Sequence, residues 1–262
     1  MGDSTMVQAS VNDRVLTALV AAAKMPGVHI DRVKYLRASL QRYCDAEQVE
    51  LAVVESPAAA GVPHALLDTL AGNSIRREVG KSAVLSAAAG MPGALAMPVT
   101  LPLDMTQYVG HMVRIVQKLA YLYSWPDLFE SDGQDVDDAT FNVLILFMGV
   151  MLGAQGATSS VGKVSSMIAE QLVKTLPRRA LTKGTIYPLV KKVASLIGVK
   201  MTEEIFAKGV GKAIPVIGGL VSGGITAGTL TPMSHKLRKH LASLDLAQQT
   251  RNHDYSINEP MQ

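Results

Sequence analysis

Three long windows of this chain contain no Asp, Glu, Lys or Arg, at residues 82–103, 139–162 and 213–234. Each window is 22 to 24 residues long, which is enough for a helix to cross the hydrocarbon core of a bilayer. Each is also rich in Gly, Ala, Ser, Thr or Pro rather than in Leu, Ile and Phe, so insertion into lipid would be only weakly favourable. The windows therefore fit either the core of a soluble helical protein or a membrane-active one.

Apolar residues recur at helical spacing along most of the chain, and no segment alternates convincingly with period two. Capping and breaking residues predict helices at 11–24, 31–43, 63–89, 103–123, 138–152, 161–176 and 185–197, with short ones before 55 and after 202. We expect Pro232 to open the final helix. Pro92, Pro98 and Pro102 make one continuous helix through the first window implausible, because each interior proline costs about 3 kcal/mol.

The predicted fold class is all-α, a single compact multi-helix domain with Gly/Ala/Pro-rich buried helices. We expect an N-terminal helical extension over 1–57, the main helical domain over 58–246, and a disordered polar tail over 247–262. Glycines at a spacing of four predict close helix contacts and a close-packed glycine-rich helical hairpin. These helix-packing candidates are Gly149, Gly153, Gly219, Gly223, Gly224 and Gly228.

Charge is unevenly distributed along the chain. Residues 127–138 hold six acidic residues and no basic one, whereas residues 163–212 hold ten Lys/Arg against three Glu. The basic region is either an ordinary solvated helix surface or a face that meets anionic lipid. Nucleic acid is not an expected partner, because the basic residues are spread out and no binding motif or aromatic stacking set accompanies them. The lipid-binding candidates are Lys174, Arg178, Arg179, Lys183, Lys191 and Lys192.

Motifs for chemistry are sparse. The three Gly-Lys pairs all lack the rest of a phosphate-binding loop, the six His are scattered, and Cys44 is the only cysteine. We therefore expect no metal and no cofactor. Asp104, Tyr108 and His111 fall on one face of the predicted helix 103–123 and could form an acid–base relay. The same stripe is more often the solvated face of an amphipathic helix.

Four segments resemble the EcsC family, a bacterial group named from a protein encoded beside an ABC transporter. They are AAAGMPGALAMP at 87–98, LPLDM at 101–105, AYLYSWPDL at 120–128 and FAKGVGKAIPVIGG at 206–219. The match spans roughly residues 58–241, and one departure is Ser124, where the family usually has Gly. The resemblance implies an all-helical protein of the bacterial cytoplasm, associated with the inner face of the cytoplasmic membrane and linked to transport or secretion. It supplies no catalytic residues.

Three functions remain open from the sequence. The first is a non-catalytic accessory or scaffold protein that binds an anionic membrane surface or a membrane protein. The second is a soluble helical bundle that binds a lipid or another apolar ligand. The third is an enzyme that uses Asp104, Tyr108 and His111. The sequence predicts neither the ligand nor the oligomeric state.

Overall fold

The computed structural model describes residue 17 and residues 19–90, 97–129, 136–171, 175–197 and 217–248. The all-α prediction is confirmed, since the described residues form helices and turns without a strand. A helix also spans residues 187–197. The labelled helices are α2 (Arg32–Leu40), α3 (Ala46–Val54), α4 (His64–Gly90), α5 (Met97–Leu122), α6 (Asp138–Leu152), α7 (Ala157–Gln171), α8 (Arg178–Thr182), α10 (Ile217–Ala242) and α11 (Asp245–Gln248).

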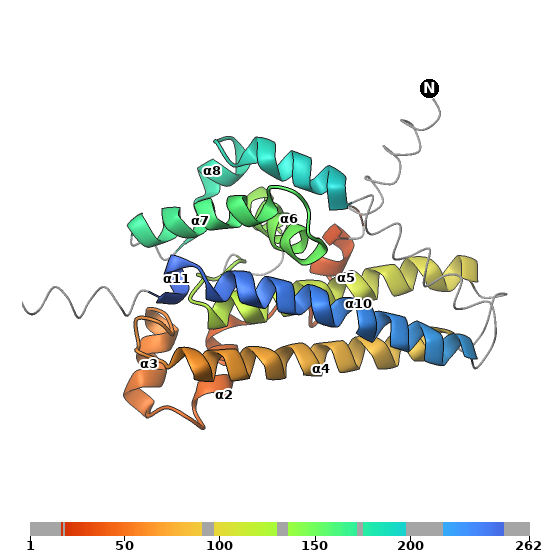
Figure 1. Ribbon diagram of the computed structural model, residues 1–262, viewed down its shortest axis with the longest axis horizontal. Helices are drawn as coiled ribbons and strands as arrows, with labels where there is room; N and C mark the ends of the chain where they lie inside the picture. Colours follow the sequence, from red (N-terminus) through yellow and green to blue (C-terminus); the bar gives the residue numbers. More distant parts are fainter. Residues whose placement is uncertain are drawn as a thin grey trace, which may run out of the picture.

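Three long helices, α4, α5 and α10, run along the length of the molecule (Figure 1). With 26 or 27 residues each, they are about 40 Å long at a rise of 1.5 Å per residue. α10 packs along α4 on one side and against α6 on the other. α7 and α8 pack on α6 and form the outer layer on that side, whereas α2 and α3 lie at one end of α4 (Figure 1).

Helix ends follow the predicted caps. Asp31 Oδ1 accepts a hydrogen bond from the N–H of Lys34 at 2.9 Å, and Asp137 Oδ1 accepts one from the N–H of Thr140 at 2.9 Å. Gly153 ends α6 with φ of 67°, the left-handed conformation that glycine adopts without steric cost. These local signals set the boundaries of α2 and α6, so these ends could be predicted from the sequence.

The prediction that Pro232 opens a separate helix is wrong. Pro232 lies inside α10, which continues unbroken from Ile217 to Ala242. An interior proline costs about 3 kcal/mol, and we attribute its tolerance to the packing of α10 on α4 and α6. α5 likewise begins at Met97, upstream of the predicted start at residue 103. The predicted helix near 202 lies outside the described residues, as do half of the residues predicted as helix over 11–24 and nearly all of the predicted tail.

The core is continuous through the molecule. α6, which occupies the second uncharged window, is buried at nearly every position. Trp125, the only tryptophan of the chain, is fully buried and meets the ring of Phe147 edge-on, with 4.8 Å between centroids. Leu36 and Leu40 of α2 belong to the same hydrophobic cluster. The predicted boundary at residue 57 therefore does not separate two cores.

A buried arginine ties the N-terminal helices to the rest of the core. Arg32, the first residue of α2, is only 8% exposed. Its Nη1 donates to the carbonyl of Val53 at 2.7 Å, and its Nη2 and Nε donate at 3.3 Å to the carbonyls of Glu55 and Trp125. The side chain thus joins α2 to the end of α3 and to the turn that follows α5.

Two of the predicted packing glycines lie at close helix contacts. A Cβ on Gly223 of α10 would come within 2.9 Å of the carbonyl oxygen of Ala83 on α4. A Cβ on Gly149 of α6 would overlap with Val193 Cγ1 of the helix at 187–197. The glycine-rich helix therefore packs closely, as predicted, and it does so on α4. The segment with which it would form a hairpin, residues 198–216, lies outside the described residues.

The remaining glycines have other surroundings. Gly153 serves as the C-cap of α6, and the side-chain environment of position 219 lies outside the described residues. At Gly224 and Gly228 an added Cβ would meet no described atom within 4 Å. These two positions are corrections to the predicted set, because a spacing of four does not reveal which glycine of a helix faces its neighbour.

Two alanine substitutions in α10 are expected to change stability in opposite directions. Gly223→Ala should lower the free energy of unfolding by about 1–3 kcal/mol, because the methyl group would push α10 away from the backbone of α4. Gly228→Ala should raise it by up to about 1 kcal/mol, because alanine favours the helix and the space is open. Urea denaturation measures both. Shifts of the same sign would contradict the packing described here.

Candidate functional site

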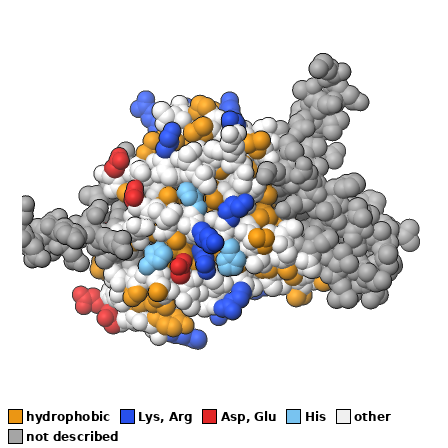
Figure 2. All heavy atoms as spheres, in the orientation of Figure 1, with side chains coloured by type: hydrophobic (Ala, Val, Ile, Leu, Met, Phe, Trp, Pro, Cys, Tyr) orange, Lys and Arg blue, Asp and Glu red, His pale blue; other side chains and the backbone are white. Residues whose placement is uncertain are grey.

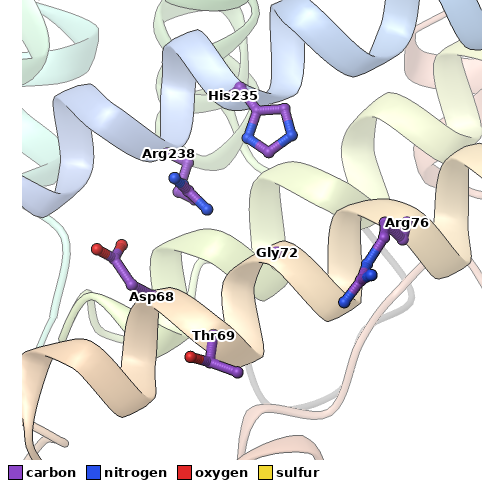
Figure 3. A pocket seen from close by; sticks show the side chains of 6 residues that line it. All are labelled: Asp68, Thr69, Gly72, Arg76, His235 and Arg238. Carbon is purple, nitrogen blue, oxygen red and sulfur yellow. The ribbon is translucent and has the colours of Figure 1, made fainter.

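An open hollow of about 390 Å³ lies where α4 and α10 run side by side. Asp68, Thr69, Gly72 and Arg76 line it from α4, and His235 and Arg238 line it from α10 (Figure 3). Residues 68, 72 and 76 are four apart, and residues 235 and 238 are three apart, so each helix presents one face to the hollow. Figure 2 shows basic and histidine side chains gathered in the middle of this face of the molecule.

Arg238 projects from α10 toward α4 (Figure 3). Its Nε is buried, and no acceptor lies within hydrogen-bonding distance of that nitrogen in the described part of the chain. Its Nη1 lies 3.5 Å from the position that a Cβ on Gly72 would occupy. The guanidinium thus rests over the glycine, where any larger side chain would compete with it for space.

Among the described residues, Asp68 is the one acidic residue that lines the hollow. Its carboxylate contacts two other side chains. The buried Tyr123 hydroxyl donates to Asp68 Oδ1 at 2.5 Å, and His64 Nδ1 lies 3.8 Å from Oδ2. Burial raises the pKa of Tyr123, and the neighbouring Asp68 raises it further. The tyrosine therefore keeps its proton and holds one oxygen of the carboxylate.

The other side chains of the hollow are hydrogen-bond donors. Arg76 Nη2 donates to Asn73 Oδ1 at 2.5 Å, which leaves the other guanidinium N–H groups of Arg76 for further acceptors. Burial lowers the pKa of His235 below its usual 6.5, and the charges of Arg238 and Lys239 lower it further. With His235 neutral, two guanidinium groups and one carboxylate line the hollow, so its lining has a net positive charge.

A second cluster of charges is buried between α4 and α5. Its centre is Glu78, which has no solvent-exposed side-chain surface. Arg114 binds this carboxylate in a bidentate manner at 3.0 and 3.1 Å, His111 Nδ1 lies 3.1 Å from Oε2, and Lys118 Nζ contacts Oε1. Lys81 Nζ lies 3.9 Å from Oε1. We call these five residues the Glu78 cluster.

The Glu78 cluster holds more positive than negative charge. Burial raises the pKa of the Glu78 carboxyl, but the hydrogen bonds from His111, Arg114 and Lys118 lower it by more, so the carboxyl stays ionised well below its usual pKa. Burial lowers the pKa of Lys118, and the nearby charges of Arg114 and Lys81 add to this, against the opposing effect of Glu78. The carboxylate of Glu78 on α4 thus binds three side chains of α5 and holds the two helices together.

The predicted relay of Asp104, Tyr108 and His111 stays a prediction, and two of its three side chains make contacts with other helices. The Tyr108 hydroxyl is 3.3 Å from Thr229 Oγ1 on α10, whereas His111 binds Glu78 on α4. The hydroxyl and the imidazole therefore make contacts with two different helices. Asp104 lies in α5, and its side chain is outside the described residues.

Most of the predicted lipid-binding residues lie on or between two elements on the outside of the molecule, α8 and the helix at 187–197. Arg179, Lys183, Lys191 and Lys192 are exposed, and Figure 2 shows Lys and Arg side chains along this edge. Arg178 instead pairs with Asp137, with 2.6 Å between Nη1 and Oδ2. Lys174 lies outside the described residues.

Comparisons with protein-family models, with curated proteins and with solved structures found no match to this chain. The resemblance to the EcsC family therefore stays a prediction. Ser124, where that resemblance expects glycine, has φ of 69°, and its Oγ accepts a hydrogen bond from the N–H of Ala58 at 3.1 Å. This backbone conformation is the left-handed one that favours glycine.

Two further properties bear on function. None of the described helices is both long enough and apolar enough to cross a membrane. The described residues also contain no group of three or more His, Cys, Asp or Glu that could hold a metal ion.

Sequence reasoning missed both polar sites. The spacing of His111, Arg114 and Lys118, three and four residues apart, places them on one face of a helix and indicates a shared anionic partner. The spacing of His235 and Arg238 likewise places both on one face of α10. Neither pattern reveals the partner residue, because Glu78 lies 33 residues before His111, and the α4 residues of the hollow are much farther from α10 in the chain.

Proposed function

We propose that this protein is a non-catalytic helical accessory or scaffold protein that docks on an anionic membrane surface. The attachment uses residues 175–197, which we call the basic layer. One observation carries the proposal: the basic layer contains five Lys/Arg and no Asp or Glu, and four of those five side chains are exposed. A surface of one charge sign, on the outside of the helical stack, complements a bilayer that contains acidic lipid.

The expected strength of this attachment follows from the charges. Each basic residue close to an anionic leaflet contributes about 1 kcal/mol, and the attraction falls off within a Debye length of about 8 Å at physiological salt. The four exposed basic side chains would together contribute about 4 kcal/mol, which is a moderate and reversible attachment. Lys191 Nζ lies 4.8 Å from the ring centroid of Tyr187, an aromatic residue suited to the membrane interface.

Docking is the proposed mode of attachment rather than insertion. The most apolar of the three windows forms α6 and is already buried in the core of the protein. The resemblance to the EcsC family supports the same assignment, and it suggests the inner face of a bacterial cytoplasmic membrane and a link to transport or secretion.

The two other functions have less support. The hollow between α4 and α10 is open and lined by charged side chains, which does not suit an apolar ligand. An enzyme based on Asp104, Tyr108 and His111 would need a relay, and His111 instead binds the buried Glu78.

Flotation with liposomes tests the proposal. We expect the protein to float with vesicles that contain acidic phospholipid, not with neutral ones, and to detach at high salt and in a carbonate wash. Changing Arg179, Lys183, Lys191 and Lys192 together to Gln should abolish most of this binding, because four of the cationic contacts are lost.

A matched variant controls for net charge. Lys34, Arg37, Arg42 and Arg77 are also exposed and lie on or beside α2 and on α4, away from the basic layer (Figure 1). Changing these four to Gln removes the same total charge and should leave flotation nearly unchanged. Equal losses in the two variants would mean that net charge alone, and not the basic layer, attracts the membrane. Absence of binding to acidic vesicles would refute the proposal altogether.

A further inference from the structure

The hollow between α4 and α10 contains hydrogen-bonding capacity that the protein itself does not use. Arg238 Nε is buried and has no acceptor among the described residues. A guanidinium has five N–H groups and is always charged, so leaving part of it out of water without an acceptor is costly. The other guanidinium N–H groups of Arg238 border the hollow, where a ligand can supply acceptors.

Cationic donors outnumber acceptors in the hollow, and the carboxylate of Asp68 is already partly used. Arg238 and His235 project from α10 into the space that Arg76 borders on α4 (Figure 3). The carboxylate of Asp68 accepts from Tyr123, and the hydroxyl of Thr69 donates to the carbonyl of Ala65 at 2.9 Å. The hollow is therefore prepared for a ligand that accepts hydrogen bonds and has a negative charge.

We propose that this hollow binds the phosphate group of a phosphate monoester. The planar fork of Arg238 matches two phosphate oxygens, and Arg76 and His235 border the same space from the two helices. A ligand phosphate with two negative charges balances two guanidinium groups, whereas a ligand carboxylate would supply only one negative charge. The open volume of about 390 Å³ is larger than a phosphate group, so the esterified part of the ligand can extend into solvent.

His235 makes this binding dependent on pH. Before binding, burial and the positive charges of Arg238 and Lys239 on α10 keep its pKa below 6.5, while Asp68 and Arg76 face the same hollow from α4. A bound dianion favours the charged imidazolium, so binding takes up a proton. The affinity should therefore rise as the pH falls toward the pKa of the free histidine.

Calorimetric titration of the full chain with glycerol 3-phosphate tests the site. We expect saturable binding that Arg238→Gln weakens about 10-fold or more, because a bidentate contact to a charged group is lost. Arg238→Lys keeps the charge but not the fork and should also bind more weakly. The control is Lys236→Gln, an exposed cation of the same helix whose Nζ lies beside Gly153 of α6. It should bind as the wild type does.

A phosphate monoester itself takes up a proton at about pH 6, so its binding would change with pH even without His235. Sulfate keeps its two charges between pH 5 and 8 and therefore reports only on the titration of the protein. Its affinity should rise from pH 8 to pH 5.5 in the wild type and much less in His235→Gln. Circular dichroism confirms that each variant is folded. Absence of saturable binding, or equal affinity in the wild type and in folded Arg238→Gln, would overturn the proposal.

The phosphate group could belong to a soluble compound or to a lipid headgroup, and vesicles distinguish the two sources. The variant with four Gln in the basic layer is used here, so that docking through that layer does not contribute. Phosphatidylcholine vesicles doped with phosphatidic acid should compete with glycerol 3-phosphate for this variant if the site accepts a lipid phosphate, and should not compete if it accepts only soluble esters. The variant with four Gln in the basic layer should still bind glycerol 3-phosphate. Binding at the hollow can thus fail or succeed independently of membrane docking.

Discussion

Replacing Glu78 by Gln is expected to lower the free energy of unfolding by about 3 kcal/mol. The carboxylate is fully buried and is shared by His111, Arg114 and Lys118 of α5. Removing its charge leaves these partly buried cations facing one another across the contact between α4 and α5. Breaking a buried ion pair by removing one partner typically costs about 3–5 kcal/mol. Urea denaturation of both proteins at pH 7 measures the difference.

The same carboxylate should make the wild type sensitive to acid. Because the pKa of Glu78 in the folded protein lies far below its ordinary value of 4.5, the folded state binds the proton less readily than the unfolded state does. The resulting stabilisation is fully present above about pH 4.5 and is lost as the pH falls further, toward the pKa of the folded state. The difference in stability between wild type and Glu78→Gln should therefore shrink as the pH is lowered from 5 to 3.

Glu50 provides the matched control. It also binds an arginine in a bidentate manner, with 2.8 and 2.7 Å to Arg37, but both side chains are about half exposed. Glu50→Gln should leave the urea midpoint nearly unchanged, because exposed ion pairs contribute little. If Glu78→Gln proved as mild as Glu50→Gln, the Glu78 cluster would not clamp the two helices in the way described here.

Replacing Arg32 by Leu is expected to cost about 3 kcal/mol as well. Leucine fills much of the space but donates no hydrogen bond, so the carbonyls of Val53, Glu55 and Trp125 lose a charged donor in a buried place. Two of these carbonyls lie at the end of α3, where a helix has no partners of its own for them. The measurement is again urea denaturation.

Arg37→Leu tests whether burial is the cause. Arg37 lies on the same helix, and its side chain is 48% exposed. Its replacement should change the urea midpoint far less than Arg32→Leu does. Arg32→Lys keeps the charge but cannot reach three acceptors with one ammonium group, so its stability should lie between those of the wild type and Arg32→Leu. Similar midpoints for Arg32→Leu and Arg37→Leu would contradict the assigned role of Arg32.

The parts of the fold that depend on residues close together in the sequence could be predicted from it. Asp31 and Asp137 cap helices because a side chain can reach backbone N–H groups two or three residues away, and the sequence alone places those groups. The prediction that Pro232 opens a separate helix is wrong because the continuity of α10 is not set by nearby residues. Its continuity depends on α4, which lies about 150 residues earlier in the chain.

The polar sites depend on which helices are neighbours, and periodicity does not give that information. The relay of Asp104, Tyr108 and His111 is a prediction along one helix, and the spacing gives no sign that His111 also contacts α4 and Tyr108 also contacts α10. Glu78 was overlooked because a single glutamate in a charged helical segment usually faces solvent. Only the pairing of α4 with α5 shows that this one is buried.

The position of Trp125 gives the protein an intrinsic fluorescent reporter. The chain has no other tryptophan, and this indole is shielded from water at the place where the turn after α5 meets α6 and the guanidinium of Arg32. Its emission should shift to longer wavelength once that junction opens, and it should be insensitive to ionic contacts made by the exposed side chains of the basic layer. A change in emission on adding vesicles would therefore signal a rearranged core, and unchanged emission would signal docking of an intact molecule.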